Sequence, residues 1–121
     1  MSPNSGNRCA IELKFFKKEN HREPNNRYDV FFDLANLEMY KESEIDLCFF
    51  MLGTDHEHYV NQKYYSVNTK DFDFKDGSLY RKGTALCYNT SKHYGPDIIL
   101  KNDYKFLWDK FTSINFLKVE I

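Results

Sequence analysis

The sequence predicts one α+β domain over residues 9–121, built on a mixed sheet whose first two strands are joined by a long helix. Three observations predict this class: an alternating pattern after Cys9, a helical apolar pattern after Arg27, and a nearly continuous apolar run from Ile45. The length of 121 residues is that of one ordinary domain. Residues 1–8 are mostly small and polar, and we expect them to be a disordered leader or a remnant of cloning.

The first expected strand covers residues 9–16, where apolar and polar residues alternate. A strand places alternate side chains on opposite faces, so Ile11 and Leu13 share one face while Glu12 and Lys14 share the other. We expect the face with Ile11 and Leu13 to be buried. The polar face is expected to be accessible.

Residues 27–42 are expected to form a helix, with the Asn25-Asn26 pair as its N-cap. Its apolar residues recur at helical spacing and include Tyr28, Phe31, Phe32, Ala35 and Met39. Residues 45–52 follow as a central strand covered on both faces, because the run is apolar almost throughout. A helical crossover between two strands favours parallel pairing.

The second half of the chain has weaker patterns. We expect short strands at 64–67, 84–88 and 97–100, a turn ending at Gly77, and a last strand at 116–121. Asn102 or Asp103 is expected to cap a short helix that continues to residue 111.

Composition excludes a strongly basic nucleic-acid-binding protein, since 17 Lys and Arg face 18 Asp and Glu. The three cysteines, Cys9, Cys48 and Cys87, are odd in number and irregularly spaced, which is typical of buried free thiols in a reducing compartment. No run approaches the ~18 apolar residues of a membrane span, so we expect no membrane partner. The expected location is the cytoplasm.

The sharpest chemical motif is Glu12-Leu13-Lys14 on the first strand. The two charged side chains lie roughly 7 Å apart along one strand face, from the rise of a strand. A carboxylate there can bind Mg²⁺, and an ammonium can stabilise the developing charge of a phosphate. Glu12 is therefore the candidate metal ligand, and Glu12 with Lys14 forms the candidate catalytic pair.

This motif, followed by a helix and a strand, resembles the PD-(D/E)xK phosphodiesterases, which include restriction and repair nucleases. The resemblance covers residues 9–52 and implies a restriction-endonuclease-like core that hydrolyses DNA with Mg²⁺. Some members carry Gln and Tyr four residues apart on this helix, and Asn36 and Tyr40 have that spacing. The resemblance thus implies that Asn36 and Tyr40 contact nucleic acid.

The chain departs from this family because no acidic residue on a strand precedes Arg8. Three explanations stay open: the domain is a nuclease fragment truncated at its N-terminus, the second acid comes from elsewhere in this chain or from a second copy, or the domain cleaves nothing. Asp55 and Glu57 are the first candidates for a replacement acid. With one carboxylate alone, we expect weak metal binding and little or no DNA cleavage.

The alternative class is a small non-catalytic interaction protein, such as an antitoxin, an immunity protein or a phage-defence partner. Its partner would be another protein or a second copy of the chain. The aromatic and acidic surface would then serve recognition.

Other residues have two interpretations each. Lys17, Lys18 and Arg22 could contact DNA phosphates, although Glu19 and Glu23 interrupt this stripe and a solvated surface is the alternative. The run Asp55-His56-Glu57-His58 offers metal ligands but no recognisable third position, which favours a solvated loop. Four aromatic residues suited to base stacking are expected instead in the core: Phe72, Phe74, Tyr80 and Trp108. Cys48 is expected to pack rather than to act as a nucleophile.

Overall fold

A computed structural model describes residues 8–18, 23–43, 45–61, 70–88 and 95–121. The first half of the chain contains β1 (Cys9–Phe16), α1 (Glu23–Glu42), β2 (Leu47–Thr54) and α2 (His58–Asn61). The second half contains β3 (Leu79–Tyr80), β4 (Ala85–Leu86), β5 (Ile98–Ile99), β6 (Tyr104–Lys105), β7 (Trp108–Lys110) and β8 (Asn115–Glu120). The predicted α+β class is confirmed.

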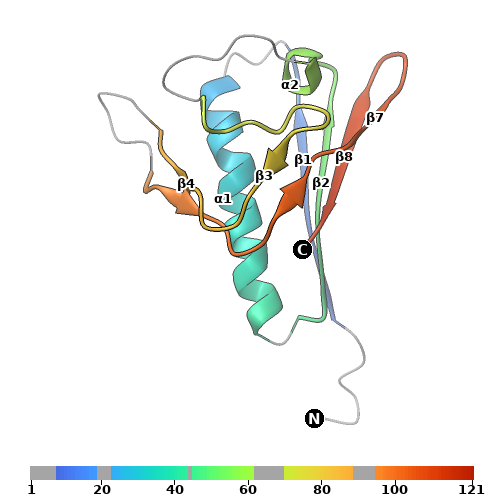
Figure 1. The fold of residues 1–121 in the computed structure, drawn as a ribbon. Helices are drawn as coiled ribbons and strands as arrows, with labels where there is room; N and C mark the ends of the chain where they lie inside the picture. The colour runs from blue at the N-terminus through green and yellow to red at the C-terminus, as the bar shows by residue number, and fades with distance from the viewer. Residues whose placement is uncertain (1–7, 19–22, 44, 62–69, 89–94) are drawn as a thin grey trace.

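The main sheet is mixed and has the strand order β1-β2-β8-β7. β1 and β2 are parallel, β8 is antiparallel to β2, and β7 is antiparallel to β8. The helix α1 connects the two parallel strands and packs against one face of the sheet (Figure 1). The predicted order of strand, helix and parallel strand is therefore confirmed.

The helix α1 begins earlier than the sequence indicated. Pro24 lies in its first turn, where its missing N–H has no helical partner to lose. Asn25 and Asn26 lie inside the helix, so their prediction as the N-cap is wrong. Buried apolar residues follow the helical period: Val30, Phe31, Leu34 and Leu37. Phe32 and Met39, which were also expected on this face, are exposed.

The two faces of β1 are the reverse of those predicted. Ile11 and Leu13 are 52% and 70% exposed, whereas Glu12 and Lys14 lie on the side that faces α1. The register explains this, because Glu12 pairs with Phe50 and paired residues project to the same face of a sheet. The buried Phe50 fixes which face of β2 lies under α1. Glu12 and Lys14 must then take that face on β1.

β2 was expected to be covered on both faces, and this prediction is wrong for the part of the chain that the structure describes. Cys48, Phe50 and Leu52 are buried, while Leu47 and Met51 on the other face are exposed. Cys9 is exposed as well, contrary to the expectation of buried cysteines, and all three cysteines are free. Among the described residues, no helix combines the length and apolar character of a membrane span.

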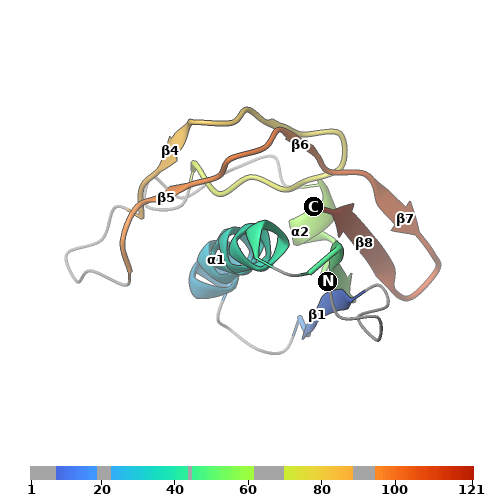
Figure 2. The same ribbon diagram turned by 90° about the horizontal axis from the view of Figure 1, so that it is seen from below.

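The second half of the chain forms a layer of short strands across α1, with β3 paired to β6 and β4 paired to β5 (Figure 2). Phe31 joins this layer to the helix, because its ring lies 5.7 to 6.2 Å from the rings of four aromatic residues. Those residues are Phe72, Phe74, Tyr80 and Phe106. Aromatic pairs at such distances add to the stability that burial supplies.

The helix expected to run to residue 111 is absent, since β6 and β7 occupy that region. Tyr104, Phe106 and Trp108 are buried while the residues between them are exposed, which is the period of a strand. The expected strands at 84–88, 97–100 and 116–121 are present with altered ends. Gly77 has the expected turn conformation, with φ of +85°. The strand expected at 64–67 lies outside the described residues.

A buried carboxylate joins α1 to the turn between β5 and β6. Glu38 is 4% exposed, and its oxygens accept hydrogen bonds from Lys101 N at 2.8 Å, Asn102 N at 3.1 Å and Tyr104 OH at 2.6 Å. One turn later, the exposed Glu42 forms a 2.7 Å ion pair with Lys101 Nζ. These contacts hold the second layer on the helix.

Candidate functional site

Glu12 and Lys14 lie on the face of β1 that is turned toward Asp33 of α1, and the polar cluster of these three residues is here called the groove. The Lys14 ammonium lies 3.0 Å from Asp33 Oδ2 on the helix, and the two side chains are 25% and 15% exposed. Glu12 projects from the same face of β1, two residues before Lys14. The groove therefore brings together two carboxylates and one ammonium.

The groove exists because β1 is an edge strand of the sheet. α1 packs mainly on β2, so its apolar residues cover the centre of the sheet. A second, polar stripe follows the helix at positions i, i+4, i+7 and i+11: Asp29, Asp33, Asn36 and Tyr40. Asp33 reaches β1 from this stripe.

Asp33 is a partly buried carboxylate with one cationic neighbour, Lys14, and two carboxylate neighbours, Glu12 and Asp29. Burial raises the pKa of Asp33, and the nearby carboxylates of Glu12 and Asp29 raise it further, although Lys14 acts in the opposite direction. Asp33 Oδ2 is shielded from solvent, and the Lys14 ammonium lies 3.0 Å from it. A carboxylate in such a place gains from an additional cation.

The donors in this groove suit Mg²⁺ better than a metal that needs a full set of protein ligands. Mg²⁺ is commonly bound by one or two carboxylates, with water and substrate phosphate completing its coordination. Glu12 and Asp33 provide two carboxylates, and across the described ranges no group of three or more His, Cys, Asp and Glu is placed to share a metal.

Asp33 was missed by the sequence analysis, which looked for the second acid at Asp55 and Glu57. Those residues follow the end of β2, and Thr54 is paired with Phe16 rather than with Glu12. Glu12 lies four positions before Phe16 on β1, which is roughly 13 Å along the strand. Neither Asp55 nor His56 thus comes to the groove. Asp33 could have been considered from the sequence, because it lies on the same polar stripe of the helix as Asn36 and Tyr40.

The predicted DNA-contacting residues lie at two places. Lys17 and Lys18 are exposed directly after β1, so they lie at one end of the groove strand. On α1, Asn36 is half-buried and Tyr40 is exposed, on the same helical stripe as Asp33. Arg22 lies outside the described residues.

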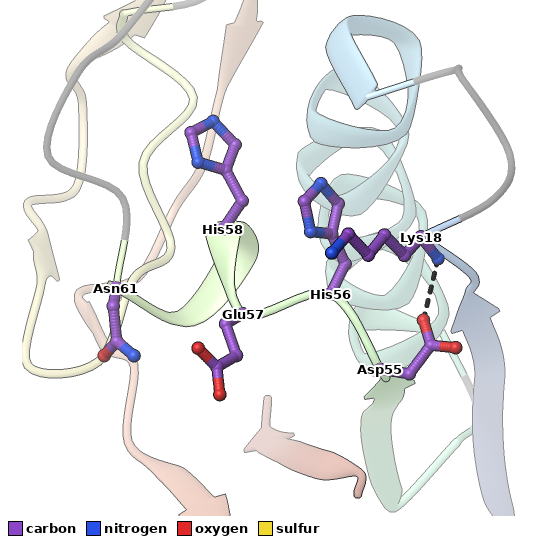
Figure 3. Close-up of a pocket in the computed structure, with 6 residues that line it drawn as sticks. All are labelled: Lys18, Asp55, His56, Glu57, His58 and Asn61. Atoms are coloured by element: carbon purple, nitrogen blue, oxygen red, sulfur yellow. Dashed lines mark hydrogen bonds between the residues drawn. The ribbon is translucent and has the colours of Figure 1, made fainter.

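A second feature is a hollow of ≈ 490 Å³ at the carboxyl ends of β1 and β2 (Figure 3). It is lined by Lys18, Asp55, His56, Glu57, His58 and Asn61. Lys18 N donates a 2.7 Å hydrogen bond to Asp55 Oδ1, and the rings of His56 and His58 stack with their centroids 5.5 Å apart. In Figure 3 the two imidazoles point to one side while Glu57 points to the other. The side chains of His56 and His58 are thus directed away from that of Glu57, and they do not converge on one point with it.

A buried arginine fixes the wall of this hollow. Arg27 is fully buried, donates to the carbonyl of His58 at 3.3 Å, and lies over the ring of Tyr59 at 5.1 Å. Thr54 Oγ1 donates to Phe16 O at 2.6 Å and accepts from His56 N at 3.0 Å, which joins the ends of β1 and β2. These contacts hold one wall of the hollow against the ends of β1 and β2.

The aromatic residues suited to base stacking are core residues, as predicted: Phe72, Phe74, Tyr80 and Trp108. Trp108 Nε1 donates to Phe74 O at 2.8 Å, so its polar atom is used inside the protein. Cys48 is also part of the core, and burial raises the pKa of its thiol. No protein-family model matches the sequence, and comparisons with curated proteins and with solved structures find no match either.

Proposed function

We propose that this domain is a metal-dependent phosphodiesterase that acts on DNA and has a restriction-endonuclease-like core. The observation that carries this proposal is the groove in which Glu12 and Lys14 on β1 meet Asp33 on α1. It joins two carboxylates to an ammonium at an accessible sheet edge. That set of groups suits a hard divalent cation together with a phosphate.

Each of the three residues has a role that follows from its position. Glu12 and Asp33 would hold Mg²⁺, and the ion would supply charge neutralisation and make a bound water molecule more acidic. The Lys14 side chain is 25% exposed and lies on the same strand face as Glu12, so its ammonium can contact a phosphate oxygen bound there. There it stabilises the charge that develops in the transition state.

The residues around the groove would position the DNA strand. Lys17 and Lys18 lie beyond the carboxyl end of β1, where they can neutralise phosphates next to the one that reacts. Asn36 and Tyr40 continue the stripe of Asp33 along α1 and can contact sugar or base edges. Arg22, which precedes α1 in the sequence, is proposed to contact DNA phosphates as well.

Calorimetric titration with Mn²⁺ and nicking of supercoiled plasmid test this proposal. We expect Mn²⁺ binding to be lost in Glu12→Gln and Asp33→Asn but kept in Lys14→Ala, and nicking to be lost in all three variants. Asp109→Asn is the matched control, because Asp109 is an exposed carboxylate on β7. Nicking that survives in Asp33→Asn, or wild-type protein that neither binds Mn²⁺ nor nicks DNA, would contradict the proposal.

One observation favours the second candidate, a non-catalytic interaction protein. The sheet face that is turned away from α1 is apolar and exposed, as expected of a surface that binds protein. If this alternative is right, Glu12→Gln and Asp33→Asn give the same Mn²⁺ titration as the wild type. The same calorimetric series therefore separates the two functions.

A further inference from the structure

The face of the main sheet opposite α1, here called the open face, consists largely of exposed apolar side chains. Six of them are Ile11, Leu13, Phe15, Leu47, Met51 and Phe116, each between 38% and 70% exposed. Phe111 extends the open face after β7, since its ring lies 5.9 Å from that of Phe116. No described helix or strand packs on this face.

The apolar area of the open face is large for a monomer. With about 200 Å² for each fully exposed large side chain, the seven exposed fractions amount to about 700 Å². The largest apolar patch of a typical monomer is about 300–600 Å². A standard interface buries about 800 Å² on each partner. The open face alone therefore supplies most of the surface that a stable dimer requires.

The strand register divides the open face into four rows across the sheet. The two middle rows are Ile11, Phe49 and Glu120, followed by Leu13, Met51 and Lys118. Glu120 and Lys118 are thus opposite charges in adjacent rows of β8. Lys118 also lies over the ring of Phe49, with its Nζ 5.1 Å from the ring centre.

The two outer rows differ in the side chains that they carry. One outer row is Cys9 and Leu47, and the other is Phe15, Gly53, Phe116 and, on β7, the exposed Asp109. Gly53 has no side chain, and a Cβ there would lie 2.9 Å from Phe15 and 3.1 Å from Phe116. The two aromatic rings therefore close over Gly53 and form a ridge at one end of the open face.

We propose that the open face binds a second copy of this chain through a two-fold axis that runs across the strands between the two middle rows. Such an axis makes the strands of the two copies run in opposite directions. It places the row that contains Glu120 against the partner's row that contains Lys118, and the reverse. Lys118 then meets the partner's Glu120, twice in the dimer. The aromatic ridge meets the partner's row of Cys9 and Leu47 at both ends of the interface.

This dimer is compatible with the groove and does not depend on it. Glu12 and Lys14 project from the opposite face of β1, toward Asp33. Face-to-face packing of two sheets buries alternate residues of each strand and leaves the others where they are. The grooves of both copies would remain open to DNA.

Sedimentation equilibrium at low to high micromolar concentration tests the contact. We expect a dimer for the wild type and a folded monomer for Leu13→Glu, because Leu13 is 70% exposed and supports no core contact in the single chain. Leu79→Glu is the matched control, since Leu79 on β3 is 63% exposed and lies off the open face. The proposal would be overturned if the wild type is a monomer, since some other molecule would then cover the open face. It would also be overturned if Leu13→Glu remains a dimer.

A charge exchange tests the two-fold register itself. Lys118→Glu and Glu120→Lys each place like charges opposite one another twice, so each is expected to weaken the dimer at least tenfold. The double variant restores opposite charges and is expected to recover the dimer. Failure of the double variant to recover, or single variants as tight as wild type, would refute this arrangement.

Discussion

Replacing Glu38 with alanine tests how the second layer is held on α1. Glu38 is 4% exposed and accepts hydrogen bonds from Lys101 N, Asn102 N and Tyr104 OH. A hydrogen bond to a charged group contributes about 1.5–3 kcal/mol, and water can replace part of it at the exposed backbone donors. The buried Tyr104 hydroxyl has no such replacement. We therefore expect Glu38→Ala to lower the free energy of unfolding by about 3–5 kcal/mol.

Glu42→Ala is the internal control for this prediction. Glu42 lies one turn further along α1 and pairs with Lys101 Nζ, but both side chains are more than half exposed. An exposed ion pair contributes about 0–1 kcal/mol. Urea unfolding monitored by circular dichroism gives both values under one set of conditions. Equal and small losses for the two variants would refute the claim that Glu38 is a buried anchor.

Three further predictions concern the core, alkaline pH and the groove. Phe31→Ala removes a fully buried ring with four aromatic neighbours and should cost about 3–5 kcal/mol in urea unfolding; an unchanged midpoint contradicts this. Burial and the Glu38 carboxylate raise the pKa of Tyr104, so its contribution to stability is complete below the unfolded value of about 10 and is lost as pH rises above it. Thermal melts should therefore fall more steeply above that pH for the wild type than for Tyr104→Phe. Burial also raises the pKa of the Asp33 carboxyl, so its contribution to stability is complete below the unfolded value of about 4 and falls as pH rises. Asp33→Asn should therefore be at least as stable as the wild type at neutral pH. A marked loss of stability would show instead that Asp33 is a structural residue.

The order of elements in the first half could be predicted because each carries a strong local signal. β2 is apolar along most of its length, and α1 repeats apolar residues at the helical period. The faces of β1 could not be predicted from β1 alone. Its alternation fits either orientation, and the choice is made by its register with Phe50 and Leu52.

The candidate site could be predicted only where local strand geometry determines it. Glu12 and Lys14 share one strand face by local geometry, and the structure confirms this. Asp33 reads in the sequence as an ordinary acidic residue of an exposed helix face. Its position beside Lys14 depends on how α1 lies across β1 and β2, which no local pattern records. The prediction of a helix up to residue 111 was wrong because Tyr104, Phe106 and Trp108 are buried at every second position, as in a strand.

Paramagnetic broadening by Mn²⁺ tests the central claim most directly, because it locates the cation residue by residue in the folded protein. In amide correlation spectra at substoichiometric Mn²⁺, the account predicts that signals of Glu12, Lys14, Asp33 and Asn36 broaden first, and that Asp33→Asn abolishes this selectivity. Broadening centred on Asp55 and Glu57, or uniform broadening without a centre, would contradict the assignment of the groove as the metal site.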